Sequence, residues 1–194
     1  MEGGHPVKKK CASVLCGGAV LVLALSGCKG DTNKLDAWAK TVCDAVQPQA
    51  QKIGSANTAI QQQTSDTSKP SDVQKTDSKA FQDMSDAYKA LASAVDRAGP
   101  PPSDGGEKKQ QDAVKELNTT SASYAGLKKQ VDGLDTEDQA KFADGLTGIA
   151  TRLQQLGKSG NDALAKLEEG DLGKSMGKQQ SCQKASTAPS TAAG

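Results

Sequence analysis

The chain of 194 residues carries 24 basic and 23 acidic side chains, so its net charge is +1 at neutral pH. This balance gives no reason to expect the basic face that nucleic-acid binding requires, and we expect no nucleic-acid partner. One tryptophan, two tyrosines and two phenylalanines are too few aromatic residues for a β-sandwich, whereas alanine and short polar residues suit long helices. The length fits one helical domain with a leader and flexible ends.

The first part of the chain has the composition of an export signal. His5–Lys10 is a basic region, and residues 12–24 are uncharged and mostly apolar. This stretch is shorter than the roughly 20 residues that a permanent membrane span needs, so we expect residues 1–27 to be a signal helix that is removed. Its removal takes away three lysines, one glutamate and the single histidine. The mature chain then has a net charge of −1 and no imidazole for catalysis or metal binding.

Leu25-Ser26-Gly27-Cys28 fits a lipobox, in which an aliphatic residue and two small residues precede a cysteine. The thiol of such a cysteine receives a diacylglyceryl group, and the leader is cut just before it. Two acyl chains anchor a protein stably. We therefore expect lipidation of Cys28, with residues 28–34 as a lipid-anchored tether at the extracytoplasmic face of the cell membrane. The alternatives are an ordinary secretory signal with a chance cysteine, or an uncleaved anchor helix.

Two cysteines are left for the folded domain. Cys11 and Cys16 leave with the leader and Cys28 is lipidated, so Cys43 and Cys182 remain. An even number of cysteines in an exported chain favours a disulfide, because the space outside the cytoplasmic membrane is oxidising. Two buried free thiols or a redox pair are the alternatives, although the sequence has no C-x-x-C motif.

Apolar residues at helical spacing predict two amphipathic helices in the first half of the domain. The first spans about residues 35–62, with Pro48 on its solvent side, where we expect a kink. The second begins with Ser71 or Asp72 as its cap and ends before Gly99. The apolar positions are Leu35, Trp38, Ala39, Val42, Cys43, Val46, Ala50, Ile53 and Ile60 in the first helix, and Val73, Ala80, Phe81, Met84, Ala87, Tyr88, Leu91, Ala94 and Val95 in the second.

Two more helices follow the glycine- and proline-rich break at residues 99–106. The third spans about residues 107–131, although Ser121 and Lys128 interrupt its apolar positions. The fourth starts with the capping box Thr136-Glu137-Asp138-Gln139. The apolar positions are Val114, Leu117, Tyr124 and Val131 in the third helix, and Phe142, Leu146, Ile149, Leu153, Leu156, Leu164 and Leu167, with Gly160 on the same face, in the fourth.

These segments predict an all-α domain over residues 35–184, an antiparallel up-down-up-down bundle of four main helices. A further helical piece carries Leu172 and Cys182. In such a bundle the first helix starts at the end where the last one finishes, which brings Cys43 and Cys182 together. Residues 185–194 are small residues and proline, and should form a disordered tail.

No motif of the chain predicts a catalytic, metal or cofactor site. Gly170–Ser175 resembles a phosphate loop, but Glu168 stands where that motif needs its first glycine, which favours a turn beside a helix. Glu168, Glu169 and Asp171 lie in no EF-hand loop and favour a solvated turn. Trp38 is expected in the core rather than at a lipid surface. We therefore expect a protein that is not an enzyme.

The leader with its lipobox resembles those of bacterial lipoproteins. The domain is similar in style to small secreted lipoproteins of high-GC Gram-positive bacteria, and Trp38–Cys43 and Ser181-Cys182 carry that similarity. The resemblance implies a location at the cell membrane and no particular activity.

We expect a non-enzymatic binding or adaptor module of the cell envelope, whose protein partner and oligomeric state the sequence does not name. The alternative is a carrier that holds an apolar ligand between its helices. A pocket lined by Met84, Leu91, Leu146 and Leu153 would favour the carrier, and a solid core with an exposed apolar patch would favour the adaptor.

Overall fold

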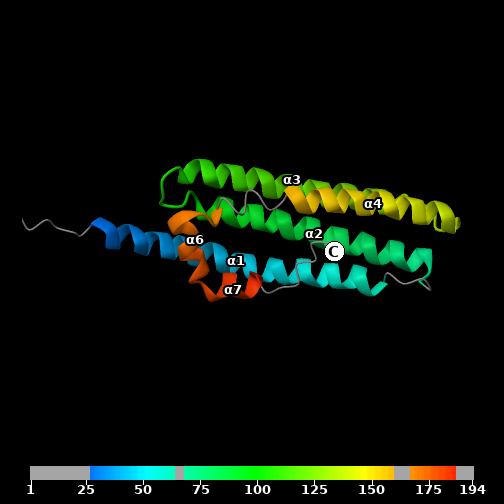
Figure 1. The fold of residues 1–194 in the computed structure, drawn as a ribbon, viewed down its shortest axis with the longest axis horizontal. Coiled ribbons are helices and arrows are strands. Elements are labelled where there is room, and N and C mark those ends of the chain that lie inside the picture. The colour runs from blue at the N-terminus through cyan, green and yellow to red at the C-terminus, as the bar shows by residue number, and fades with distance from the viewer. Residues whose placement is uncertain (1–26, 64–67, 160–166, 187–194) are drawn as a thin grey trace, which may run out of the picture.

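The computed structural model describes residues 27–63, 68–159 and 167–186, and the regular structure there is helical. The leader up to Ser26 and the tail from residue 187 lie outside the described residues, whereas Ala185 and Ser186, which we expected in the disordered tail, are helical. Four long helices pack antiparallel and short C-terminal helices follow them, which confirms the all-α up-down-up-down bundle (Figure 1). The helices are α1 (Gly27–Gln63), α2 (Pro70–Ala98), α3 (Gly106–Asp132), α4 (Gln139–Ser159), α6 (Gly170–Gly177) and α7 (Gln180–Ser186).

Helix α1 begins at Gly27 rather than near Leu35, so residues 28–34 are helical turns and not an extended tether. Once the packed part of a helix has formed, each added residue gains a hydrogen bond, so the helix extends into a polar segment. The first turns of α1 project beyond the end of the bundle (Figure 1). The helix continues through Pro48, whose side chain is exposed as expected. Within the described ranges, no helix combines the length and the apolar character needed to cross a membrane.

Helix α2 starts differently from the prediction, although it ends as expected. Its first residue is Pro70, and Lys69 precedes it without a side-chain cap, so Ser71 and Asp72 lie inside the first turn and cap nothing. Proline suits this position because its fixed φ is helical and its missing N–H would be unpaired there anyway. At the other end Gly99 has a φ of 71°, a left-handed conformation that favours glycine.

The cap of α4 is Asp138 and not Thr136. The Asp138 carboxylate accepts a hydrogen bond from the Lys141 backbone N–H at 3.1 Å, which satisfies one of the free donors of the first turn. That backbone bond, followed by the Lys141 ammonium at 3.0 Å, lowers the pKa of Asp138. The fourth helix therefore begins later than the capping-box motif predicts.

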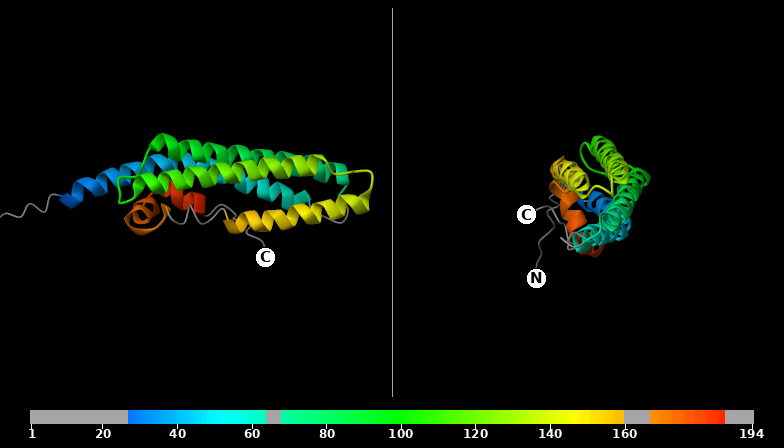
Figure 2. Two further views of the ribbon diagram at one scale, coloured as in Figure 1. Left: turned by 90° about the horizontal axis from the view of Figure 1, so that it is seen from above. Right: turned by 90° about the vertical axis from the view of Figure 1, so that its right-hand side faces the viewer.

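The bundle has two halves along its length, each with its own core. Helix α4 covers one half, and α6 and α7 cover the other, against the first part of α1 (Figures 1 and 2). The half that α6 and α7 cover is called the disulfide half, and its buried apolar residues are Leu35, Trp38, Ala39, Val42, Cys43, Leu91, Ala92, Val95, Ala113, Leu117, Leu167, Leu172 and Met176. The half that α4 covers is called the α4 half, and its buried apolar residues are Ala56, Ala80, Phe81, Met84, Leu127, Val131 and Ile149.

The predicted stripe of the fourth helix is divided between these cores. Phe142 and Ile149 are buried, whereas Leu146, Leu153 and Leu156 are half-buried. Leu167, expected at the end of this stripe, lies beyond α4 and belongs to the core of the disulfide half. The intervening positions Gly160 and Leu164 lie outside the described residues.

Small and polar residues hold α2 against α3 where the sequence pattern looked interrupted. The Ser85 hydroxyl donates to the Ser121 carbonyl at 2.9 Å, and the Ser121 hydroxyl donates to the Ser85 carbonyl at 2.8 Å. Both serines are buried, and their short side chains let the two helices approach closely. Ser121 therefore does not interrupt the seam, because its hydroxyl is paired within it.

Candidate functional site

The disulfide links the two ends of the described domain. Cys43 of α1 and Cys182 of α7 are bonded, with 4.9 Å between their Cα atoms, which confirms the predicted pair. Cys43 is fully buried, whereas Cys182 is partly buried against the same core. A bond of this kind stabilises chiefly by restricting the unfolded chain, and the restriction is large because the closed loop spans 139 residues.

Polar contacts flank this disulfide. The Ser181 hydroxyl lies 2.6 Å from the Asp44 carboxylate, and Lys178 lies 3.5 Å from that of Asp36. Hydrogen bonds from Lys40 and then Ser181 lower the pKa of Asp44, and a hydrogen bond from Ser175 is the main cause that lowers the pKa of Asp36. These exposed pairs fix the orientation of α6 and α7 on α1 more than they add stability.

Trp38 belongs to the core, as predicted. Its side chain is buried beside the disulfide, and its indole N–H donates to the Gly99 carbonyl at 2.8 Å. Gly99 follows the last residue of α2, so this bond satisfies a carbonyl at the end of that helix. The tryptophan thus joins the start of α1 to the loop between α2 and α3.

The segment that resembles a phosphate loop forms helix α6. Gly170 has a φ of 67° and opens the helix, Ser175 is buried, and Lys174 pairs with Asp171 at 2.9 Å. These residues therefore form a helix start with an exposed ion pair. In the part of the chain that the structure describes, no three His, Cys, Asp or Glu side chains gather where they could hold a metal ion.

The four residues named for a carrier pocket are divided between the two cores. Met84 is buried in the core of the α4 half and Leu91 in that of the disulfide half. Leu146 and Leu153 are half-buried against the α4-half core. The sequence periodicity places all four on inward faces, but it does not show that they lie at different levels of the bundle.

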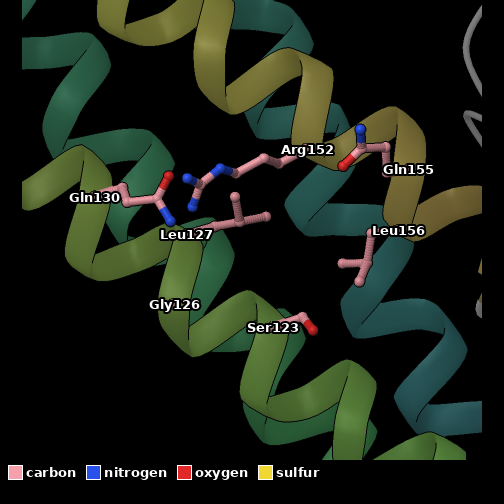
Figure 3. Close-up of a pocket in the computed structure, with 7 residues that line it drawn as sticks. All are labelled: Ser123, Gly126, Leu127, Gln130, Arg152, Gln155 and Leu156. Atoms are coloured by element: carbon pink, nitrogen blue, oxygen red, sulfur yellow. The ribbon is translucent and has the colours of Figure 1, made fainter.

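A cavity that the sequence did not predict opens between α3 and α4, with a volume of about 350 Å³ (Figure 3). Helix α3 contributes Ser123, Gly126, Leu127 and Gln130 to its wall. Helix α4 contributes Arg152, Gln155 and Leu156. A Cβ atom added to Gly126 would meet no other atom within 4 Å, so the missing side chain leaves this space open.

Arg152 gives this cavity its electrostatic character. Its side chain reaches from α4 across the cleft toward Gln130 of α3, with Leu127 beside it (Figure 3). The wall contains no acidic residue, and Arg152 makes no ion pair with any described residue. Two features of the sequence could have indicated this cavity: a glycine inside α3 and an arginine in a chain whose other cations are mostly lysines. Neither feature shows that α3 and α4 leave a space between them.

Two further buried groups have shifted pKa values. Burial raises the pKa of Asp77 of α2 to about 6, and one of its carboxylate oxygens has no hydrogen-bond partner among the described residues. The rings of Tyr88 and Tyr124 stack with 5.4 Å between their centroids. Burial, followed by repulsion from Tyr88, raises the pKa of Tyr124, which keeps its phenol neutral.

The comparisons with known proteins do not extend this picture. No protein-family model, curated protein or solved structure matches the chain.

Proposed function

We propose that this chain is a membrane-anchored, extracytoplasmic lipoprotein that acts as a non-enzymatic binding module of the cell envelope. The observation that carries the proposal is the lipobox Leu25-Ser26-Gly27-Cys28, which follows a basic region and an apolar region in the order of an export signal. The disulfide between Cys43 and Cys182 supports it, because such bonds persist in oxidising compartments. A diacylglyceryl group on Cys28 would provide the two acyl chains that stable anchoring needs.

Replacement of the lipobox cysteine tests the anchor. In a bacterial host that processes lipoproteins, Cys28→Ala should abolish labelling by radioactive palmitate and leave the leader uncut. Cys16→Ala is the matched control, because this cysteine lies in the apolar part of the leader, and it should be labelled and cut normally. A Cys28→Ala protein that is processed like the wild type and stays membrane-bound would contradict the proposal.

The partner of such a module would meet the end of the bundle that lies away from the anchor, near Pro70 and Gly133. Photo-crosslinking residues at the exposed positions Lys69 and Asp135 should then capture an envelope protein in intact cells. The same probe at exposed Pro102, in the loop at the opposite end, is the control. Adducts formed only from Pro102 would place the partner at the wrong end.

A carrier of small ligands is the second candidate function, favoured by the cavity between α3 and α4. Its volume of about 350 Å³ falls within the range of small-molecule sites, roughly 300–1,000 Å³. Such sites combine apolar walls with a few polar groups that orient the ligand. Leu127 and Leu156 would provide the apolar wall, and Arg152 the orienting group.

A further inference from the structure

The cavity between α3 and α4 combines an apolar wall with one positive charge, Arg152, which has no ion-pair partner among the described residues. We propose that it binds a small amphiphilic anion, whose acidic group lies against Arg152 and Gln130 and whose alkyl chain lies against Leu127 and Leu156. This inference rests on the second candidate function, ligand binding by the helical domain. Binding at the cavity does not depend on the lipid anchor, and only the argument that the ligand comes from solution uses it.

Two lysines on α3 and α4 have their charges compensated by nearby carboxylates. Lys128 pairs with Asp132 at 2.6 Å, and Lys141 pairs with Asp138 at 3.0 Å. Arg152 has no such pair with a described residue, and no carboxylate lines the cavity that it enters. A guanidinium group presents a fork of N–H donors that fits the two oxygens of a carboxylate or phosphate group.

The amide of Gln130 supplies a second polar contact on the opposite helix. In Figure 3 its side chain points toward Arg152 across the cleft. An acidic group placed between them would accept hydrogen bonds from α3 and α4 at once. The ligand would therefore bridge α3 and α4.

The wall of the same cavity includes two leucines, one from each helix. Leu127 is buried in the core of the α4 half, and Leu156 is half-buried against that core. Gly126, the residue before Leu127 on α3, lines the same cavity and projects no side chain into it. An alkyl chain there would cover the half-buried leucine and remove its remaining surface from water, which is favourable in proportion to the apolar area buried.

A second hollow, on the outer surface of α2 and α3, can be compared with the cavity between α3 and α4 by the residues that line it. Its volume is about 300 Å³, and its wall includes Lys79, Asp83, Lys128 and Asp132. These four side chains pair with one another, Lys79 with Asp83 and Lys128 with Asp132, both at 2.6 Å. Lys75 also lines this hollow, so its charges are not fully neutralised, but none of its lining residues is aliphatic or aromatic and it lacks the leucine wall of the first cavity.

The position of the cavity indicates a ligand that arrives from solution. Leu127 shares its core with Ala56 of α1, and the helix from Cys28 to Ala56 is about 40 Å long at about 1.5 Å per residue. On an upright bundle the cavity would lie beyond the lipid headgroups. The suitable ligand is thus a soluble acid with a short alkyl chain.

The test measures binding of octanoate, octan-1-ol and octylammonium to the full-length protein in lipid nanodiscs by equilibrium dialysis, with empty nanodiscs as the blank. Gly126→Leu places a side chain in the cavity without meeting the protein at its Cβ atom. Gly148→Leu is the matched control, because Gly148 is exposed on α4 and its Cβ atom would also meet nothing within 4 Å. Arg152→Gln removes the charge and keeps a polar side chain.

The expected result is saturable octanoate binding that Gly126→Leu abolishes and Gly148→Leu preserves. Arg152→Gln should weaken octanoate about tenfold or more, as expected for losing a hydrogen bond to a charged group. Octan-1-ol should bind at least tenfold more weakly than octanoate, and octylammonium should not bind.

Two results would overturn the inference, and they differ in what they leave standing. Equal binding of octanoate and octan-1-ol, both lost in Gly126→Leu, would mean a purely apolar site; the carrier function would stand without the anion. No saturable binding of any probe would overturn the inference and the carrier together. Neither result would bear on the lipid anchor, which Cys28→Ala tests separately.

Discussion

The two halves of the bundle are held together by different means. In the disulfide half, a covalent bond, the Trp38 indole and the contact between Asp44 and Ser181 join distant parts of the chain. In the α4 half, α4 lies mainly against α3, with Phe142 and Ile149 as its buried apolar side chains and three half-buried leucines beside them. In this alanine-rich, aromatic-poor chain, specific bonds between distant residues thus hold the disulfide half together, and the packing of one apolar helix face holds the α4 half together.

The two halves also differ in how their buried polar groups are hydrogen-bonded. Buried Ser175 of the disulfide half bonds with Asp36 and lowers the pKa of that carboxyl. In the α4 half, Asp77 is buried three positions before Ala80 of the core, and one of its oxygens is unpaired among the described residues. We expect substitutions to weaken the disulfide half and, at selected positions, to strengthen the α4 half.

The largest effect should come from removing the disulfide. Replacing both Cys43 and Cys182 with alanine should lower the free energy of unfolding by up to about 5 kcal/mol, because a closed loop of 139 residues strongly restricts the unfolded chain. Urea denaturation measures the loss. Hydrogen exchange should show faster exchange first in α6 and α7; equal acceleration in α4 would mean that the two halves unfold as one unit.

The next effect is a gain of stability that depends on pH. Burial raises the pKa of the Asp77 carboxyl from its ordinary value of 3.8 to about 6 in the folded protein, a difference worth about 3 kcal/mol at most. The folded protein therefore binds the proton more tightly, and the penalty of ionisation is complete above about pH 6. Asp77→Asn should stabilise at pH 7.5, and its advantage should vanish as the pH falls below about 4.

Urea denaturation at both pH values checks this, with exposed Asp86→Asn as the control that should change little. An advantage of Asp77→Asn that is the same at pH 7.5 and pH 4 would show that the ionised carboxylate is not its source.

A pair of glycines allows the same substitution to be compared in the two halves. A Cβ atom at Gly106, at the start of α3, would lie 2.0 Å from the Pro101 carbonyl oxygen, so Gly106→Ala should destabilise by about 1–3 kcal/mol. Gly148 of α4 is open on all sides, and Gly148→Ala should stabilise by up to about 1 kcal/mol through helix propensity. Thermal melting of both variants would refute the comparison if the shifts had the same sign.

The smallest effect concerns the serine pair between α2 and α3. Ser85→Ala and Ser121→Ala should each lower the free energy of unfolding by about 1 kcal/mol, because each removes a buried hydrogen bond and leaves a carbonyl with one partner fewer. The double variant measures their coupling. Strict additivity of the two losses would mean that the serines act independently.

The sequence predicted the architecture because four segments have clear helical periodicity and because cysteine parity selects Cys43 and Cys182. It did not predict where the ends of the helices lie. Pro70 and Asp138 determine the starts of α2 and α4, while nearby Ser71 and Thr136 also fit the pattern of a cap. Local preference leaves these choices open, and the tertiary structure decides between them.

The candidate site was missed for a different reason. A cavity forms where the side chains of two neighbouring helices leave space unfilled. That Gly126 and Arg152 line such a space can be recognised only once α3 and α4 are placed side by side. Periodicity shows which face of a helix is apolar but not its neighbour at each level. The lipobox, by contrast, is a local motif, and its interpretation stays a prediction because Leu25 and Ser26 lie outside the described residues.

The hydrogen bond between Trp38 and Gly99 has a consequence for spectroscopy. The chain contains one tryptophan, so its intrinsic indole fluorescence arises wholly from the disulfide half. Loosening of α4 would leave the emission maximum unchanged while far-ultraviolet circular dichroism lost amplitude. Fluorescence and dichroism recorded in the same denaturation would therefore give two midpoints if the halves separate, and a single coincident curve if they melt together.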